Sequence, residues 1–562
     1  MPREAPVRRY LTAFDTGRLP QVFADVLVLG SGVAALRSAI EMAPTLRVAL
    51  LTKSGLTESN SYYAQGGIAA AIDEADSVAS HVADTLRTGC GLSDEAVVRR
   101  VVEAAPECVR QLIDWGAAFD QADGHFSVAR EGGHSAPRIL HARGDETGKE
   151  ITSTLLARVI RHEAVDIYEN TFAVDLLTVD GAVVGVLAWN PTHGHLVIRG
   201  RRTLLASGGL GCIYRETTNP TVATGDGLAL AYRAGGALAD LEFVQFHPTT
   251  LYIAGASRHL ISETVRGEGG RLVDKTGRAF MADYHPMGDL APRDVVSRAI
   301  LDHMRGTGAA YVYLDLTGLG AGVRDRFPGI AAACSQFDID IAVDWIPVRP
   351  SAHYMIGGVR VDETGRTGLD NLYACGEVSS TGLHGANRLG SNSLLEGLVY
   401  GRTIGRHIVR ELGASTASRL NGPGAPEHIR NDVTDSTRGR LHLPDVHDSL
   451  RAVMWRNVGI ERNGEDLAEA DGLIGFWQSY VLDKVFAGPA GWELQNMLTI
   501  GRLMTEAALV RTETRGVHHR ADYPDRDDAH WACHILMARE RETWFEPVEG
   551  GPSDRALAGG NE

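Results

Sequence analysis

A short glycine-containing stretch near the start of the chain limits the possible folds more than any other feature. Residues 25–53 contain an apolar run, DVLVLG, then GSGVAALRSAIEMA and a second apolar run, RVALLT. This order predicts a buried strand, a turn that opens a helix, and a second strand. Residues 30–35 fit the pattern G-x-G-x-x-A, in which glycines permit a tight turn and a close approach to a pyrophosphate, whose charge meets the helix N-terminus. The stretch predicts an α/β, Rossmann-like domain that binds a dinucleotide.

The residue after the second predicted strand helps to choose between dinucleotides. It is Lys53, whereas the NAD fingerprint usually has an acidic residue there for the ribose hydroxyls. Two further glycine-rich strand ends follow, LLASGGLG at 204–211 and TGLDNLYACGE at 367–377. The Gly376-Glu377 pair in the second one is similar to the site where FAD enzymes hold the ribityl chain. FAD is therefore the predicted cofactor.

Composition excludes several classes of protein. The chain has 562 residues, 44% of them hydrophobic, and can bury a large core divided among several domains. A formal net charge of -16 argues against nucleic acid as a partner. The six cysteines lie far apart without a C-x-x-C pair, so we expect reduced thiols and no metal site. With neither a secretory signal nor a membrane-spanning apolar run, we expect a soluble, cytoplasmic protein without a membrane partner.

The rest of the chain divides by its local patterns. Residues of about 242 to 352 mix helices, glycine-rich turns and polar clusters, as an inserted domain would. The polar stretch at 414–437 predicts a linker. Three long amphipathic segments follow it and predict a helical bundle of about three helices. The polar C-terminal end is expected to be disordered.

A series of motifs in order along the chain resembles the fumarate reductase/succinate dehydrogenase flavoprotein family. The resemblance covers nearly the whole chain, and within the family it is closest to the branch that oxidises aspartate. It implies an α/β FAD-binding domain (1–241 and 354–425), an inserted α+β capping domain (242–353), a C-terminal three-helix bundle (436–545) and a disordered tail (546–562). The motifs are SNSYYAQGGIAAA (59–71), EGGHS (131–135), TTNP with GDGLALAYRAG (217–235), EFVQFHPT (242–249), SETVRGEGG (262–270), LAPRDVVSRAI (290–300), RPSAHYMIGGV (349–359) and TGLHGANRLGSNSLLEGLVYG (381–401).

The same resemblance, together with the glycine pattern, gives the residues expected to bind FAD. Respiratory members of the family carry a histidine that bonds covalently to the flavin. Asn60 stands at that position, with no histidine between Leu56 and Ala71, so we expect FAD to be bound without a covalent bond. The expected cofactor residues are Gly30, Ser31, Gly32, Val33, Ala34, Lys53, Asn60, Ser61, Tyr62, Tyr63, Ala64, Gln65, Gly66, Gly67, Asp226, Glu377, Ser393 and Leu394.

A glutamate among basic residues, Glu131 in SVAREGGHSAPR, has two interpretations. One is a solvated loop with a surface ion pair. The other is a site for a small molecule that carries both signs of charge, since a carboxylate near an ammonium group stabilises it but repels a plain dicarboxylate. The aspartate-oxidising branch has a glutamate here that binds the substrate amine, so the resemblance favours the second.

A buried four-carbon dicarboxylate needs compensating cations and hydrogen-bond donors. Arg388 can clamp one carboxylate, and the resemblance adds further polar residues around it. Taken singly, each histidine is better explained as a core residue bonded to backbone, and it is their joint occurrence in matching motifs that favours substrate binding. The expected substrate-binding residues are Glu131, Gln245, His247, Ser262, His353, Arg388 and Ser391.

Arg293 matches the acid/base arginine of the family, with Glu263 and Arg266 as the relay that serves it. Without the motif, Arg293 would be read as a solvated residue in a first helical turn after Pro292. The resemblance implies hydride transfer from the Cα of L-aspartate to the flavin N5, giving iminoaspartate. It also implies reoxidation by dioxygen or fumarate and a hand-off of the product to quinolinate synthase, towards NAD.

Two other functions are compatible with parts of this sequence. A soluble fumarate reductase or succinate-oxidising flavoprotein would share most of the motifs, but Asn60 and Glu131 argue against it. A flavoprotein that acts on RNA would need a basic, aromatic-rich segment, which the acidic chain lacks.

Overall fold

The computed structural model describes residues 7–73, 75–254, 259–414, 427–434 and 441–548. Its main sheet has seven strands in the order β10-β11-β12-β2-β3-β9, with β19 paired to β12. The strands from β12 to β9 run parallel, whereas β10 and β11 form an antiparallel extension. The strands are β2 (Gln21–Leu29), β3 (Val48–Leu51), β9 (Val165–Tyr168), β10 (Phe172–Val179), β11 (Ala182–Asn190), β12 (Gly194–Leu205) and β19 (Leu372–Ala374).

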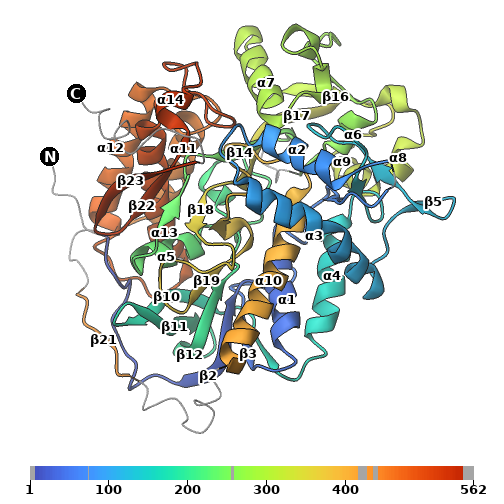
Figure 1. Cartoon of the computed structure of the whole chain (residues 1–562). Coiled ribbons are helices and arrows are strands. Elements are labelled where there is room, and N and C mark those ends of the chain that lie inside the picture. Colours follow the sequence, from blue (N-terminus) through green and yellow to red (C-terminus); the bar gives the residue numbers. More distant parts are fainter. Residues whose placement is uncertain (1–6, 74, 255–258, 415–426, 435–440, 549–562) are drawn as a thin grey trace.

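The helix predicted after the glycine turn is α1 (Val33–Met42), and it lies against α10 (Asn392–Ala414) (Figure 1). Glycines along α10 permit the close approach. A Cβ atom at Gly401 would lie 2.7 Å from the carbonyl oxygen of Ala34, and one at Gly405 would lie 2.9 Å from that of Ser38. This packing brings the N-terminal ends of both helices to the same side of the sheet. Helices α2 (Val78–Thr88), α3 (Glu95–Asp114) and α4 (Thr147–Val159) complete this layer.

The inserted segment forms its own antiparallel sheet, in the order β14-β17-β16-β15, around a separate apolar core. This is the predicted capping domain. Strand β17 continues to Met355, two residues beyond the proposed boundary at 353, because its pairing with β14 extends to that residue. Its elements are β14 (Val244–Leu251), α6 (Thr264–Gly267), β15 (Arg271–Val273), α7 (Arg293–Thr307), β16 (Val312–Asp315), α8 (Val323–Arg326), α9 (Pro328–Ser335) and β17 (Ile346–Met355).

The C-terminal region contains the three expected helices, α11 (Leu443–Asn457), α12 (Gly464–Val481) and α13 (Pro489–Val510). It also contains a hairpin that the sequence analysis assigned to the bundle and its tail. The hairpin joins a five-stranded sheet, β20-β18-β13-β22-β23, and so ties the end of the chain to the FAD-binding domain. The hairpin consists of β22 (Cys533–Ala538) and β23 (Arg541–Pro547), and the other strands of the sheet are β13 (Leu238–Ala239), β18 (Gly358–Arg360) and β20 (Ser379–Ser380). Two further helices are α5 (Asp226–Arg233), in the FAD-binding domain, and α14 (Asp528–Trp531), in the C-terminal region.

Two predictions of irregular structure are partly wrong. The predicted linker contains β21 (Arg430–Asn431), which pairs with β1 (Phe14–Asp15), and the rest of it lies largely outside the described residues. The predicted tail begins inside β23, and residues 549–562 are likewise not described. The short elements are β4 (Ile68–Ala69), β5 (Gln121–Ala122), β6 (His125–Phe126), β7 (Val128–Ala129), β8 (Ile139–Leu140) and the 3-10 helices η1 (Gly211–Ile213), η2 (Met281–Asp283), η3 (Gly288–Leu290), η4 (Thr317–Leu319) and η5 (Gly376–Val378).

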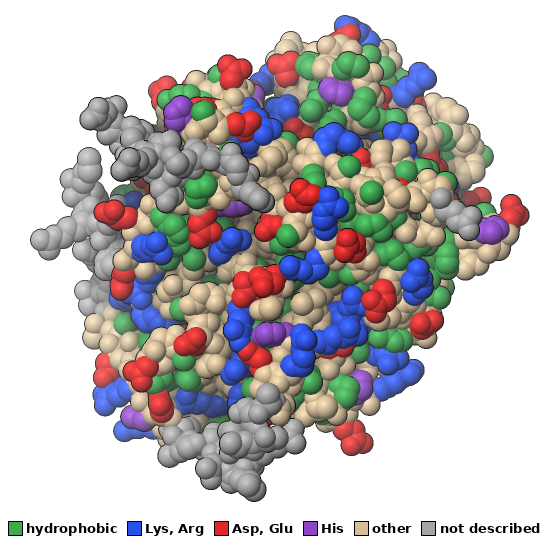
Figure 2. All heavy atoms as spheres, viewed as in Figure 1, with side chains coloured by type: hydrophobic (Ala, Val, Ile, Leu, Met, Phe, Trp, Pro, Cys, Tyr) green, Lys and Arg blue, Asp and Glu red, His purple; other side chains and the backbone are tan. Residues whose placement is uncertain are grey.

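The surface mixes both signs of charge. On the face seen in Figure 2, acidic and basic side chains are interspersed over all parts of the molecule. Among the helices that the structure describes, none is long and apolar enough to cross a membrane.

Candidate active site

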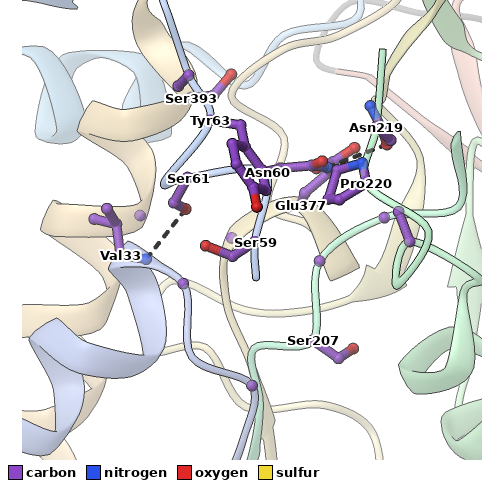
Figure 3. Close-up of a pocket in the computed structure, with 18 of the residues that line it drawn as sticks. Val33, Ser59, Asn60, Ser61, Tyr63, Ser207, Asn219, Pro220, Glu377 and Ser393 are labelled. Carbon is purple, nitrogen blue, oxygen red and sulfur yellow. Dashed lines mark hydrogen bonds between the residues drawn. The ribbon is translucent and has the colours of Figure 1, made fainter. Parts of the chain in front are cut away.

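One large cavity lies where the FAD-binding and capping domains meet. Its walls come from the ends of β2, β3, β12 and β19, from the loop 58–67, and from the start of α10. The capping domain closes it with His247, Ser262, Glu263, Arg293 and His353. Figure 3 shows part of the wall, with α1 on one side and the segments that carry Ser207, Asn219 and Glu377 on the other.

The glycine turn has the geometry that a pyrophosphate requires. Gly30 has φ +124°, and a Cβ atom there would lie 2.1 Å from the carbonyl oxygen of Ala206, so no other residue fits without displacing the next strand. The amide of Val33 donates to Ser61 Oγ at 3.2 Å (Figure 3). This contact places the loop 58–67 over the N-terminus of α1, where backbone amides and hydroxyls meet the cavity.

Lys53 lies at the end of β3 and bonds to acidic side chains. Its Nζ atom donates to Thr224 Oγ1 at 2.5 Å and to Asp226 Oδ2 at 2.7 Å. Burial alone would lower the pKa of Lys53, but nearby carboxylates outweigh it and raise the pKa. The acid missing from the strand end is therefore supplied at this point of the cavity by Asp226.

Asn60 connects two other parts of the wall. Its Nδ2 atom donates to Glu377 Oε2 at 2.9 Å and to Asn219 Oδ1 at 3.1 Å (Figure 3). Glu377 Oε1 accepts from the amide of Met355 at 3.0 Å, and burial raises the pKa of its carboxyl group. Asn219 and Ser207 were missed in the sequence analysis, although both lie in motifs quoted there. Nothing in those motifs distinguishes the residue that faces the cavity from its neighbours.

Several buried polar atoms on this wall have no hydrogen-bond partner among the described residues. They include Gln65 Oε1, Ser207 Oγ, His247 Nε2 and Arg388 Nε. Buried polar groups are normally paired, so these atoms indicate a polar ligand. Together with the glycine turn, they fit a dinucleotide at one end and a smaller polar molecule at the other.

Two arginines and two histidines gather at the capping end of the cavity. The rings of His247 and His353 lie 5.2 Å apart. Burial, followed by the charge of Arg293 for His247 and of Arg388 for His353, holds both pKa values well below the ordinary range, so both rings are neutral. Burial, followed by the charge of Arg293, lowers the pKa of Arg388 to about 10, which leaves it charged at neutral pH. The arrangement favours an anionic ligand.

Gln245, a predicted substrate residue, does not line the cavity. It is fully buried, and its Oε1 atom accepts from Arg388 Nη1 at 3.0 Å and from Arg293 Nη1 at 3.2 Å. Its amide nitrogen donates to the carbonyl oxygen of Arg388 at 2.8 Å. Gln245 therefore holds the two arginines at a fixed separation from behind.

Arg293, Glu263 and Arg266 form one buried chain. Arg293 Nε donates to Glu263 Oε2 at 2.5 Å, and Arg266 Nη2 donates to Glu263 Oε1 at 3.2 Å. Burial raises the pKa of Glu263, but the two guanidinium groups outweigh it and lower the pKa. The side chain of Arg293 is only 10% exposed, so the interpretation as a solvated first-turn residue is wrong. Arg266 is fully buried and lies behind Glu263, away from the cavity.

Glu131 is buried, with 3% of its surface exposed, so the interpretation as a solvated loop charge is also wrong. It lies behind the cavity lining, where its Oε2 atom accepts from Ser391 Oγ at 2.8 Å and its Oε1 atom accepts from Thr264 Oγ1 at 3.0 Å. A Cβ atom at Gly390 would lie 3.2 Å from both Glu131 Oε2 and Arg293 Nη2. Glu131 and Arg293 thus approach the same small space, which the glycine leaves open.

Most of the predicted site residues lie together. All the predicted cofactor residues except Tyr62 line the cavity, and Tyr62 instead packs its ring against Tyr63 at 5.6 Å. Of the predicted substrate and catalytic residues, Glu131, Gln245 and Arg266 lie behind the lining and the others on it. The described residues contain no cluster that could hold a metal ion.

Comparisons with known proteins identify the relatives of this chain. Residues 25–394 match the family described as FAD binding domain, and residues 489–552 match the family described as fumarate reductase flavoprotein C-term. An L-aspartate oxidase of Streptomyces coelicolor is 41% identical over 534 residues, covering 92% of this chain and 91% of the relative. One of Yersinia pestis is 42% identical over 522 residues, covering 90% and 96%.

Solved structures give the same architecture. The E. coli quinol fumarate reductase FrdA superposes with a TM-score of 0.86 at 32% identity, covering 94% of this chain and 97% of that one. Mycobacterium smegmatis Sdh1, solved in complex with UQ1, superposes with a TM-score of 0.78 at 32% identity, covering 95% of each chain.

Proposed function

The chain belongs to the L-aspartate oxidase family, within the fumarate reductase and succinate dehydrogenase flavoproteins, and we propose which cavity residues bind the cofactor, bind the substrate and supply the proton. It oxidises L-aspartate to iminoaspartate with FAD as cofactor, and the electrons pass on to dioxygen or fumarate. This is the first step of NAD biosynthesis by way of quinolinate.

The nucleotide end of the cavity holds the cofactor in this proposal. The amides at the start of α1 and the loop 58–67 would hold the pyrophosphate of the cofactor. Lys53 and Asp226 lie at one end, and the Asn60–Glu377 pair lies further along the wall. When bound, FAD supplies the electron-accepting chemistry, while the chain orients the substrate against it.

The capping end holds the two carboxylates of the substrate. Arg388 forms a charge-assisted pair with one of them, because its guanidinium group is buried and charged. His247 and His353 line the same space and donate hydrogen bonds, and the hydroxyl groups of Ser262 and Ser391 line it beside them. Closing the cavity with capping residues excludes water and strengthens each of these interactions.

Arg293 moves the proton that fumarate reduction requires. It is held against Glu263, which in turn contacts Arg266, so a proton lost by Arg293 can be replaced along this buried chain. Arginine is an unusual acid because its guanidinium group is almost always protonated in water. The buried carboxylate of Glu263, between the two guanidinium groups, provides the path by which Arg293 regains its proton.

From its position just behind Ser391 of the cavity lining, Glu131 binds the substrate ammonium group and so distinguishes aspartate from succinate. The observation that carries this proposal is a buried carboxylate, held by two hydroxyls, within reach of the space that Arg293 faces. A succinate site gains nothing from such a carboxylate, because it would repel the ligand.

The test uses purified enzyme without oxygen. L-Aspartate should bleach the flavin, and succinate should not. Glu131→Gln should lower kcat/KM for L-aspartate at least ~100-fold, as expected for loss of a buried ion pair, while fumarate reduction by a dye-reduced enzyme changes little. Equal losses with both ligands would contradict the role of Glu131. Bleaching by succinate alone would favour the succinate-oxidising alternative.

Two finer points belong to the same proposal. We place the enzyme in the cytoplasm, where reduced thiols and the rest of NAD synthesis are expected. Iminoaspartate is an unstable imine, so we also propose that it passes to quinolinate synthase soon after release. Co-purification from cells at low salt tests that hand-off.

A further inference from the structure

A threonine of the capping domain contacts the carboxylate proposed to bind the substrate amine. Thr264 opens the short helix α6 and is 2% exposed. Its hydroxyl donates to Glu131 Oε1 at 3.0 Å. The neighbouring residue, Glu263, contacts Arg293. One turn of chain therefore serves two different functions, proton supply through Glu263 and the orientation of Glu131 through Thr264.

The two hydroxyls on Glu131 come from different domains. Ser391 belongs to the FAD-binding domain, at the start of α10, and donates to Oε2 at 2.8 Å. Thr264 belongs to the capping domain and donates to Oε1. Both oxygens of the carboxylate are thus fixed only when the capping domain is in place. If the capping domain moves away, one of the two donors is lost.

The proton positions in this group follow from simple hydrogen-bond chemistry. An ionised carboxylate only accepts, so the single hydroxyl proton of Thr264 is directed to Glu131. Thr264 Oγ1 can then only accept from Ser262 Oγ, 3.1 Å away. Ser262 lines the cavity. A chain of hydroxyls therefore links the surface that meets the substrate to the ionised state of Glu131.

The surroundings of Glu131 make these donors necessary. The carboxylate is buried and faces Glu263, which disfavours its charge, while Arg293, Arg266 and Arg388 favour it. Burial followed by the charge of Glu263 raises the pKa of Glu131, and the hydroxyls of Ser391 and Thr264 act in the opposite direction. Loss of one hydroxyl should therefore raise the pKa further.

We propose that Thr264 is a specificity-determining positioning residue, which holds the Glu131 carboxylate in the orientation that binds the substrate ammonium group when the capping domain is closed. The proposal rests on the amine-binding role of Glu131. It adds that this role depends on a hydroxyl from the capping domain and that aspartate recognition is complete only in the closed form.

The test compares Thr264→Val, which removes the hydroxyl at similar volume, with Thr264→Ser, which keeps it. Thr264→Val should raise KM for L-aspartate about tenfold, consistent with a hydrogen bond to a charged group. Its kcat/KM for fumarate should stay within about twofold of wild type. The acidic limb of the kcat/KM profile for L-aspartate should move to higher pH. Thr264→Ser should restore KM and the pH profile.

The control is Thr505→Val. Thr505 is also fully buried, and its hydroxyl donates to the carbonyl oxygen of Gly501 at 2.8 Å, far along the sequence in α13. It should change neither the KM for L-aspartate nor its pH profile. If Thr264→Val does not fold with FAD, Thr264→Ala gives the same comparison with less steric demand.

The outcomes separate this inference from the function on which it rests. If Glu131→Gln discriminates between aspartate and fumarate but Thr264→Val does not, the inference on Thr264 is overturned and the role of Glu131 stands. If Thr264→Val weakens both substrates equally, or Thr264→Ser fails to restore the pH profile, Thr264 is only structural. If Glu131→Gln weakens L-aspartate and fumarate equally, the amine-binding role of Glu131 is itself contradicted, whatever the Thr264 variants show.

Discussion

Lys53, at the end of β3, and Glu493, on helix α13, form an ion pair with 2.7 Å between Nζ and Oε1. The two residues are 440 positions apart in sequence. Lys53 also pairs with Asp226, whose other oxygen accepts from Asn496 of the same helix at 2.7 Å. The C-terminal bundle is thereby joined to the nucleotide end of the cavity. Lys53, at a position usually held by an acidic residue, therefore contacts two acidic residues, Asp226 and Glu493.

This contact predicts that Glu493 affects FAD binding without touching the cavity. In Glu493→Gln, Lys53 loses one of its two counter-charges and the bundle loses a tie to the FAD-binding domain. We expect the dissociation constant for FAD to rise about fivefold, roughly 1 kcal/mol. Titration of the apoprotein with FAD by flavin fluorescence measures it. Asp471→Asn, which breaks an ion pair to Arg502 within the bundle, is the control and should leave FAD affinity unchanged. Similar losses in both variants would contradict the proposed link.

Asn60 predicts that the flavin is not attached to the chain. Its side chain is an amide, already engaged with Glu377 and Asn219, and offers no nucleophilic nitrogen to the flavin. We expect acid precipitation of the protein to leave all of the yellow colour in the supernatant as intact FAD. Flavin that stays with the pellet would show that another residue forms a covalent bond.

Asp145 predicts a contribution to the docking of the capping domain. From the FAD-binding side, its two oxygens accept the amides of Gly329 at 3.0 Å and Ile330 at 2.8 Å, at the start of α9. Asp145→Ala leaves both amides unpaired, at a cost of about 1 kcal/mol. We expect faster amide hydrogen exchange over α9, together with a lower kcat/KM for L-aspartate. Asp145→Asn keeps one acceptor oxygen, so its hydrogen exchange over α9 and its kcat/KM should lie between those of wild type and of Asp145→Ala. Unchanged exchange over α9 in Asp145→Ala would rule out this role.

Two buried histidines predict how stability depends on pH. His81 and His134 lie beside Arg138, whose partners are Asp76 and Asp84. Burial lowers the pKa of His81 to about 4, and burial followed by the charge of His81 lowers that of His134 to about 3. In the unfolded chain both titrate near 6.5, so between pH ~6.5 and ~4 the unfolded state binds more protons. Stability should therefore fall as the pH falls through this window, by at most about 1.4 kcal/mol per pH unit for each histidine.

The measurement is the thermal unfolding midpoint at pH 7, 6 and 5. His81→Gln removes one titrating group, so its midpoint should fall less steeply with pH than that of wild type. His442→Gln, at a side chain that is 71% exposed, serves as the control and should keep the wild-type slope. Equal slopes in all three proteins would mean that His81 does not set this dependence.

The sequence by itself determined the features that depend on neighbours along the chain. Apolar runs and the glycines at 30 and 32 define a strand, a turn and a helix, because backbone geometry at a turn is a local property. The motifs around Arg293, Arg388 and Glu131 likewise identified the chemistry that surrounds the cavity. Those residue types, charged and yet expected in a buried site, are informative without any structure.

Only the tertiary structure decided which of these residues face the cavity and what holds them. Gln245 and Glu131 have the composition of ligand-binding residues, yet they lie behind the wall and bond to its arginines and hydroxyls. Thr264 and Glu493 carry no local signal, and strand β22 of the C-terminal hairpin pairs with β13, which lies about 300 residues earlier in the sequence. A buried polar group must find a partner, but which side chain becomes that partner depends on how distant segments pack. The partner is therefore set by the tertiary structure, and no pattern along the chain identifies it.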